Sequence, residues 1–199
     1  MVDLFYEPED ATPLAPEERV ALLQDWITHR KELNEAEQDN IVHAVAWARR
    51  RIRQIETADI LTADFVKELH RRMFREVWRW AGMYRSTERN IGAEAIQIPQ
   101  LVPQFLDNIR YWVANSTHPK DEIAVRLHHG LVQIHPFPNG NGRHTRLIAD
   151  LLVERMGGIA FTWGGAQLSN QSDLRSRYIK ALKLADGHQI EELVAFARS

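Results

Sequence analysis

Apolar residues recur every three or four positions along most of this chain, which is the spacing of helices with one buried face. The most regular stripe follows Thr62, whose hydroxyl suits a helix N-cap. The stripes are Ile41, Val45, Ile52 and Ile55; Phe65, Leu69, Met73 and Val77; Ile123, Leu127, Leu131 and Ile134; Leu147, Ile148, Leu151 and Leu152; and Leu174, Tyr178, Leu182 and Ala185. The pattern predicts a mainly helical fold.

One short segment has a different pattern. Between Gly92 and Pro99, Ile96 and Ile98 alternate with polar neighbours, which is typical of a strand with one buried face. The sequence therefore predicts a small β-hairpin, or flap, over residues 93–98.

Composition places the chain among globular proteins of one domain with a terminal extension. It has 199 residues, of which 44% are hydrophobic, so it can bury a sizeable core. The formal net charge of -2 argues against a surface built for nucleic acid. The absence of cysteine excludes disulfides, zinc–thiolate sites and cysteine nucleophiles. No apolar run approaches the roughly 18 residues that cross a membrane, and Met1 to Tyr6 lack a signal-peptide pattern, so a cytoplasmic protein is expected.

The stretch IHPFPNGNGRHTRL joins two predicted helices and is the strongest candidate for chemistry. It places Gly140, Asn141 and Gly142 at a helix N-terminus, where free backbone N–H groups and the helix dipole favour an anion. Arg143 and Arg146 follow three positions apart, on one side of the first turn. The combination predicts a site for a di- or triphosphate, although a glycine-rich helix start alone is more often a tight turn.

Histidines near this loop suggest further chemistry. His135 directly precedes the loop, where a neutral imidazole can take a proton from an incoming hydroxyl; a buried, hydrogen-bonded histidine is the plainer alternative. His128 and His129 raise the question of a metal site, but no pair four residues apart flanks a glutamate, so zinc is disfavoured. His144 is expected to point into solvent or away from Arg143, and no role is assigned to it.

The residues HPFPNGNGRHTR resemble the signature of the Fic family, His-Pro-Phe-x-(Asp/Glu)-Gly-Asn-Gly-Arg-x-x-Arg, at every position except 139. Two further segments are similar: WRWAGMYRSTERNIG resembles the part that leads into the family's flap, and YIKALKLADGHQIEELVAFA resembles its C-terminal helices. The whole sequence is most similar to the bacterial subgroup labelled mobile mystery protein B. The resemblance implies a Fic-type helical bundle with a small β-hairpin flap, a core domain over residues 61–199 and an N-terminal helical extension over residues 1–60.

The resemblance also implies an activity, the transfer of AMP from ATP to a hydroxyl side chain of a target protein, with Mg2+ or Mn2+ as cofactor. His135 would be the general base, and Phe137 would anchor the loop in the core. The binding residues that it implies are Gly140, Asn141 and Gly142 for the α and β phosphates, Arg143 for the β phosphate, Arg146 for the γ phosphate, and Ile96, Gln97 and Ile98 of the flap for the target peptide as an added edge strand. ATP and an unidentified target protein are the implied partners, neither nucleic acid nor a membrane is expected, and a homo-oligomer is left open.

Position 139 departs from the signature, because Asn139 stands where the family has the Asp or Glu that coordinates magnesium. A carboxamide oxygen can bind Mg2+, but it carries no charge, and this hard cation prefers carboxylates. Asn139 is therefore only a weak candidate ligand. Three alternatives stay open: slower AMP transfer, use of another nucleotide or phosphorylated donor, and a nucleotide-binding relative with little activity.

A second family feature concerns autoinhibition. Many members carry Ser/Thr-x-x-x-Glu-Gly/Asn on an extra helix, whose glutamate pairs with the second arginine of the signature and blocks the γ phosphate. The segment THRKELN is similar, except that Leu33 stands where the motif has Gly or Asn and Asn34 comes one place later. The resemblance implies that Glu32, with Thr28, inhibits through Arg146. The alternative is that Thr28 ends one helix and that Asn34 with Glu37 caps the next.

Overall fold

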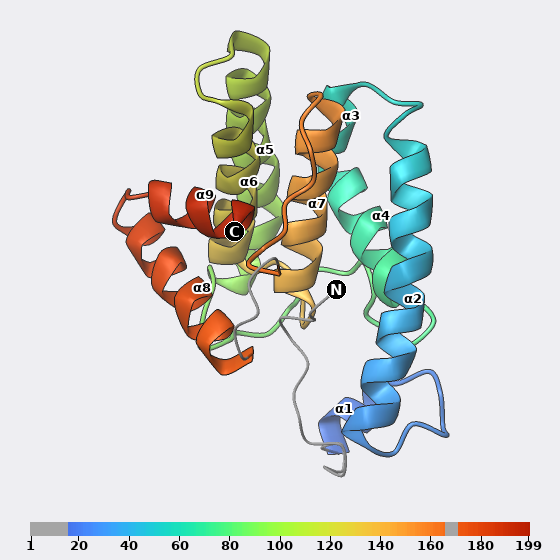
Figure 1. Cartoon of the computed structure of the whole chain (residues 1–199). Coiled ribbons are helices and arrows are strands. Elements are labelled where there is room, and N and C mark those ends of the chain that lie inside the picture. The colour runs from blue at the N-terminus through green and yellow to red at the C-terminus, as the bar shows by residue number, and fades with distance from the viewer. Residues whose placement is uncertain (1–15, 166–170) are drawn as a thin grey trace.

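The computed structural model describes residues 16–165 and 171–199, and its regular structure is almost entirely helical (Figure 1). In chain order the helices are α1 (Pro16–Ala21), α2 (Arg30–Arg51), α3 (Thr57–Ile60), α4 (Ala63–Phe74), η1 (Ala95–Gln97), α5 (Ile98–Asn115), α6 (Lys120–Ile134), α7 (Asn141–Arg155), α8 (Gln171–Asp186) and α9 (Glu191–Arg198). The mainly helical fold that the apolar stripes predicted is confirmed. Residues 1–15 of the predicted N-terminal extension lie outside the described residues. None of the helices described is both long enough and apolar enough to cross a membrane.

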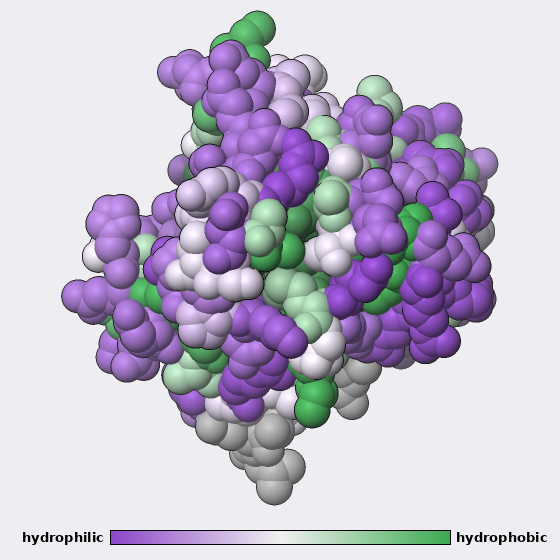
Figure 2. All heavy atoms as spheres, turned by 90° about the horizontal axis from the view of Figure 1, so that it is seen from above, coloured by the Kyte–Doolittle hydropathy of each residue, from purple (hydrophilic) through white to green (hydrophobic). Residues whose placement is uncertain are grey.

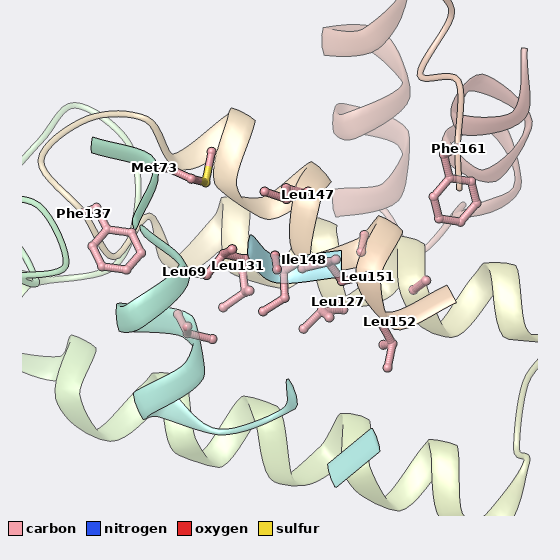
Figure 3. Packing of buried hydrophobic residues seen from close by; sticks show 14 of the residues in the cluster. Leu69, Met73, Leu127, Leu131, Phe137, Leu147, Ile148, Leu151, Leu152 and Phe161 are labelled. Atoms are coloured by element: carbon pink, nitrogen blue, oxygen red, sulfur yellow. The ribbon is translucent and has the colours of Figure 1, made fainter. Parts of the chain in front are cut away.

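Helices α6 and α7 form the centre of the molecule, with α5 packed on α6 and α4 packed on α7 (Figure 1). Leucine and isoleucine side chains on their facing sides, among them Leu127, Leu131, Ile148 and Leu151, are completely buried (Figure 3). Each such side chain contributes on the order of 1.5–3 kcal/mol by leaving water. Because α6 ends where the short connection to α7 begins, that connection is held on a rigid base.

Helix α2 begins at Arg30, well before Ile41, the first residue of the apolar stripe predicted for it. The face of α2 that packs on α4 differs from the face that carries the stripe. The buried residues of α2 are Leu33, Glu37, Asn40, Ala44 and Ala48. Two of these are polar, and the alanines are small enough to let the helices approach closely. Asn40 joins the two elements, because its Nδ2 atom donates to the carbonyl oxygen of Arg72 at 3.1 Å and its Oδ1 atom accepts from the N–H of Glu76 at 3.0 Å. The first half of α2 is thereby fixed in position.

The predicted strand over residues 93–98 is wrong. The 3-10 helix η1 occupies its middle, and Ile98 is the first residue of α5. Ile98 is buried with the apolar face of that helix, whereas Ile96 is 87% exposed. Two isoleucines two positions apart fit a strand, but Ile98 is the first buried residue of a helix, and the next buried residue, Val102, follows at helical spacing. Pro99 suits the first turn of a helix, since its missing N–H would have no partner there.

The far end of the bundle, where α2 and α7 finish, is mostly hydrophilic around a central apolar hollow (Figure 2). An open cleft between the ends of these two helices is lined by Arg49, Ile52, Arg53, Glu154 and Arg155. Arg49 and Glu154 pair across it at 3.3 Å. Because α7 begins at the opposite end, this cleft is separate from the loop that carries the candidate chemistry.

Candidate active site

The signature segment, residues 135–146, comprises the loop between α6 and α7 and the first turns of α7, and the side chain of Asn141 closes that loop. Its Oδ1 atom accepts a hydrogen bond from the N–H of Phe137 at 2.9 Å, and its Nδ2 atom donates to the carbonyl oxygen of Phe137 at 2.8 Å. Both residues are buried, so water does not compete for these bonds. Phe137 therefore anchors the loop in the core, as predicted. The side chain of Asn141 is committed to the loop, which leaves its backbone N–H for an anion.

Gly140 allows the chain to turn into α7. Its φ is 76°, in the left-handed region that favours glycine, and a Cβ atom there would lie 2.4 Å from Cζ of Phe74. The N–H of His144 donates to the carbonyl oxygen of Gly140 at 3.0 Å, which starts the hydrogen bonding of the helix. The N–H groups of residues 141–143 come before that bond and have no partner within the helix. At the positive end of the helix dipole, they form a ready anion site.

His70 supports the loop from α4, a role that the sequence did not indicate. Its ring stacks on Phe137 with centroids 3.7 Å apart and planes 9° apart. The Nδ1 atom accepts from the N–H of Gly82 at 3.0 Å, so the ring proton is on Nε2, which donates to the carbonyl oxygen of Asn139 at 3.1 Å. Burial holds the pKa of His70 well below its ordinary value, so this neutral form persists at neutral pH.

His144 is completely buried, which corrects the expectation that it points into solvent; no contact between it and Arg143 is described. Its Nε2 atom donates to the carbonyl oxygen of Val66 at 2.9 Å. Burial lowers the pKa of His144 to about 4. Its ring lies edge-on to Phe137 and His70, so the floor of the loop is a cluster of aromatic rings from α4, α7 and the loop itself.

Arg143 is tied to α2 by a buried carboxylate. Its Nη1 atom donates to Oε2 of Glu37 at 2.6 Å, and Nε1 of Trp78 donates to Oε1 of the same carboxylate at 2.5 Å. Glu37 is only 3% exposed, so the ion pair forms where screening by water is weak. The guanidinium of Arg143 also lies over the ring of Phe74, 5.0 Å from its centroid. Arg143 is thus next to the anion site but already engaged by a carboxylate.

Arg146 lies near a second polar group, which consists of the buried His128 and Tyr178 and the half-buried Asp150. The hydroxyl of Tyr178 and Nε2 of His128 are 3.0 Å apart. Burial raises the pKa of Asp150 to about 7 and that of Tyr178 to about 12, and the positive charge of Arg146 opposes both shifts. The two arginines that were predicted to bind phosphates therefore have different surroundings. Glu37 forms its hydrogen bond with Arg143.

His135 ends α6 with φ 53°, a left-handed conformation that is uncommon for a residue with a side chain. Within the described part of the chain, Nδ1 of its ring has no hydrogen-bond partner. Burial lowers the pKa of His135; the carbonyl of Val132 opposes this shift, and the charges of Arg85 and Arg89 reinforce it. The imidazole is therefore neutral at pH 7, which is the form that a general base requires.

Residues 86–94, called the flap loop here, lie against His135 in place of the predicted hairpin. Gly92 has φ 100°, and a Cβ atom there would lie 2.6 Å from Cβ of His135. The N–H of Ala93 donates to the carbonyl oxygen of Ile134 at 3.2 Å. The predicted docking residues Ile96, Gln97 and Ile98 follow the flap loop in η1 and the start of α5, where they offer a peptide no strand edge.

Thr28 and Glu32 lie at the start of α2, and the carboxylate of Glu32 caps this helix. Its Oε2 atom accepts hydrogen bonds from the N–H groups of Thr28 at 2.6 Å and His29 at 3.1 Å, and from the hydroxyl of Thr28 at 3.1 Å. This reciprocal pattern is a capping box with His29 as N-cap. The predicted pairing of Glu32 with Arg146 is therefore corrected: the carboxylate of α2 that reaches the signature segment is Glu37.

Position 139 offers little to a metal ion. Asn139 is exposed, and its Oδ1 atom accepts from the N–H of Gly140 at 2.7 Å. Over residues 16–165 and 171–199, no group of three His, Asp or Glu side chains is arranged to hold a metal ion. An uncharged oxygen that already accepts a hydrogen bond fits Mg2+ poorly, because this cation prefers carboxylates in octahedral geometry.

Residues 60–153, which contain the signature segment, match the sequence pattern of the Fic/DOC family. This part of the chain belongs to the Fic/DOC family. A relative from Drosophila grimshawi named Protein adenylyltransferase Fic is 32% identical over 141 residues, which cover 68% of this chain and 28% of that protein. The chain thus spans little more than a quarter of the length of that relative. The subgroup similarity stays a prediction.

Solved structures share the Fic fold with this chain. A Fic domain containing signalling protein from Bacteroides thetaiotaomicron has a TM-score of 0.62 and 22% identity, covering 77% of this chain and 64% of that one. The N-terminal Fic domain of a VirB-translocated Bep effector protein from Bartonella quintana, solved with bound ADP, has a TM-score of 0.63 and 16% identity, covering 100% of this chain and 94% of that one. At these identities the likeness shows the fold alone.

We predict that Gly140→Ala weakens binding of a diphosphate such as ADP, as measured by isothermal titration calorimetry. The new Cβ would collide with Phe74 in a left-handed conformation that costs about 1 kcal/mol or more outside glycine, so the loop and its N–H groups must shift. Gly187→Ala, in the turn between α8 and α9, is the control, because a Cβ there would lie 3.3 Å from the carbonyl oxygen of Leu184 and φ is not positive. Equal affinities in the two variants would contradict the anion site.

Proposed function

We propose that this chain is a protein adenylyltransferase, which moves AMP from ATP to a hydroxyl side chain of a target protein. The observation that carries the proposal is the signature segment, in which a neutral His135 and the N–H groups of residues 141–143, which have no partner within α7, stand at the two ends of one hydrogen-bonded loop. The name of the Drosophila relative and the ADP in the Bartonella quintana structure support it. Membership of the Fic/DOC family supports the same reaction class.

In the proposed reaction His135 takes the proton from the target hydroxyl, and the hydroxyl oxygen attacks the α phosphorus of ATP. A bond forms between that oxygen and phosphorus, the bond from phosphorus to the α–β bridging oxygen breaks, and pyrophosphate leaves. The N–H groups of residues 141–143 stabilise charge on the α and β phosphates, and Arg143 and Arg146 bind the β and γ phosphates. Positioning and charge stabilisation of this kind supply most of the catalysis in phosphoryl-type transfer.

The second candidate function is nucleotide binding with little transfer, or transfer from a different phosphorylated donor. Asn139 favours it, because its only side-chain oxygen is committed to the N–H of Gly140 and carries no charge. For this reason the proposed transfer reaction is described without a metal ion.

We also propose that α2, within the predicted N-terminal extension of residues 1–60, inhibits the core of residues 61–199 through Glu37. The carboxylate takes the guanidinium of Arg143 that the β phosphate would need. Trp78 holds the other carboxylate oxygen, and Asn40 fixes the helix one turn further on. A phosphate must therefore displace a carboxylate that is already oriented, and this competition lowers the affinity for ATP.

His135→Ala should lower transfer of label from ATP by about 100-fold or more, while the ATP dissociation constant stays within about threefold, because a base acts in the transition state. In the wild type, the transfer rate should rise with pH through the lowered pKa of His135 and level off above it, since the neutral form is the active one. Label from ATP carrying it on the α phosphate is followed on protein gels, and affinity by calorimetry. An equal loss of rate and affinity would mark His135 as structural.

Glu37→Ala should raise ATP affinity and protein labelling by roughly tenfold, because a charge-assisted bond of about 1.5 kcal/mol no longer competes for Arg143. Glu32→Ala is the matched control on the same helix, and it should lower thermal stability while leaving ATP affinity unchanged, since this carboxylate only caps α2. The double variant Glu37→Ala, Arg143→Ala should lose the gain. If Glu32→Ala raises ATP affinity and labelling more than Glu37→Ala does, Glu32 is the inhibitory residue.

Asn139→Asp should strengthen the dependence of ATP binding and transfer on Mg2+, because a carboxylate at this exposed position is a better ligand for a hard cation. Binding and label transfer are measured across a Mg2+ titration, with Asn139→Ser as an uncharged control. Mass spectrometry of the wild type must first exclude deamidation at the Asn139–Gly140 step. Lower transfer with unchanged ATP affinity would favour a different donor.

A further inference from the structure

Arg85 is a buried cation whose acidic partner among the described residues is mostly exposed. Its side chain is 1% exposed, and it pairs at 3.7 Å with Glu88, whose side chain is 67% exposed. A solvated carboxylate compensates a buried guanidinium only weakly, so other groups must stabilise its position. Those groups are backbone carbonyl oxygens on both sides of the side chain.

On one side, Arg85 holds the end of α6 and the first residues of the signature segment. Its Nε atom donates to the carbonyl oxygen of His135 at 2.7 Å, and its own N–H donates to the carbonyl oxygen of Pro136 at 2.9 Å. The carbonyl oxygen of Ile134 lies 3.5 Å from Nη2. Carbonyl groups at the end of a helix have no intrahelical partner, so a cation is well placed there.

On the other side, the same guanidinium holds the flap loop. Nη1 donates to the carbonyl oxygen of Thr87 at 3.1 Å, and Nη2 donates to the carbonyl oxygen of Ala93. A Cβ atom on Gly92 would lie 2.9 Å from Nη2, so the loop closes tightly around the guanidinium. The planar fork of arginine can bind several carbonyls in fixed directions, which a lysine ammonium cannot reproduce.

The imidazole of His135 depends on this arrangement, because the one group described that orients its ring is the carbonyl of Val132, in the last turn of α6. Nδ1 of the ring makes no hydrogen bond of ordinary geometry with the described residues. The direction of the ring is therefore set by the left-handed backbone at His135, and the carbonyl of that residue is held by Arg85.

We infer that Arg85 is a positioning residue for the transfer reaction: it locks the backbone of His135 and fastens the flap loop beside it, so that the base and the edge of the target site move as one unit. The inference rests on the proposed function for its catalytic part. The positive charge of Arg85 also helps to keep His135 unprotonated. Arg85 contacts neither the anion site of residues 141–143 nor Glu37 in any described hydrogen bond, so nucleotide affinity should not depend on it.

The test compares Arg85→Met and Arg85→Lys with the control Arg198→Met. Arg198 also donates to backbone carbonyls, those of Ile159 at 2.7 Å and Ala160 at 3.3 Å, but it does so on α9, away from the signature segment. Four quantities are measured on the full chain: label transfer from ATP, ADP affinity, the pKa of His135 by NMR, and amide exchange at Ala93.

Both Arg85 variants should transfer about 10- to 100-fold more slowly, with ADP affinity within about threefold of wild type, as expected for a misplaced catalytic group. Exchange at Ala93 should be faster in both. The pKa of His135 should rise in Arg85→Met, where the charge is lost, and rise less in Arg85→Lys, where it is kept. Arg198→Met should lower stability and leave all four quantities near wild type.

A folded Arg85→Met with wild-type transfer and wild-type exchange at Ala93 would overturn the inference, and so would equal slowing in Arg198→Met. If Arg85→Met does not fold, Arg85→Lys decides by the same readings. If the wild type transfers no label, the proposed function fails, but exchange at Ala93 and the pKa of His135 still test whether Arg85 holds the histidine and the flap loop together.

Discussion

The two hydrogen bonds between the side chain of Asn141 and the backbone of Phe137 constrain everything else in the site. If they were absent, the N–H and carbonyl of Phe137 would be buried without partners, at a cost of about 1–3 kcal/mol for each group. With them formed, Phe137 packs against His70, and the first turn of α7 starts at a fixed angle to the end of α6. The distance between His135 and the start of α7 is therefore set by core packing and not by a flexible loop.

Two arginines, the half-buried Arg143 and the buried Arg85, contact this loop in different ways. Glu37 neutralises Arg143, so little net charge reaches the anion site while that ion pair is intact. Arg85 is held by carbonyl dipoles instead, which stabilise its charge without cancelling it, so its field still acts on His135. The first arrangement can respond to a competing anion, because a phosphate can replace the carboxylate. The arrangement at Arg85 cannot respond in this way, because its carbonyl partners belong to the backbone that Arg85 holds in place.

The sequence was sufficient for elements whose buried face is apolar and for chemistry that is local in the chain. The stripes predicted for α6, α7 and α8 lie on those helices, and the stripe of α4 does so except for Val77, which follows the end of the helix. The core position predicted for Phe137 is confirmed. Helix α2 was read only in part, since Glu37 and Asn40 occupy its buried face. His70 and Arg85 could not be found, because they meet the signature segment across 69 and 50 positions of the chain. Glu32 was preferred to Glu37 because a short motif cannot distinguish a helix cap from a distant ion pair.

Burial explains how histidines stay neutral in a site rich in cations. Burial disfavours the charged form of His70, His135 and His144, and nearby arginines add to the effect at His70 and His135. Guanidiniums keep their protons at any physiological pH, so positive charge resides on the arginines and the imidazoles stay neutral. A carboxylate at position 139 would make the imidazoles easier to protonate, because a negative charge near the loop favours the charged form of histidine. The uncharged Asn139 thus adds no negative charge that would favour protonated His135, and the same missing charge makes its side chain a poor ligand for a divalent cation.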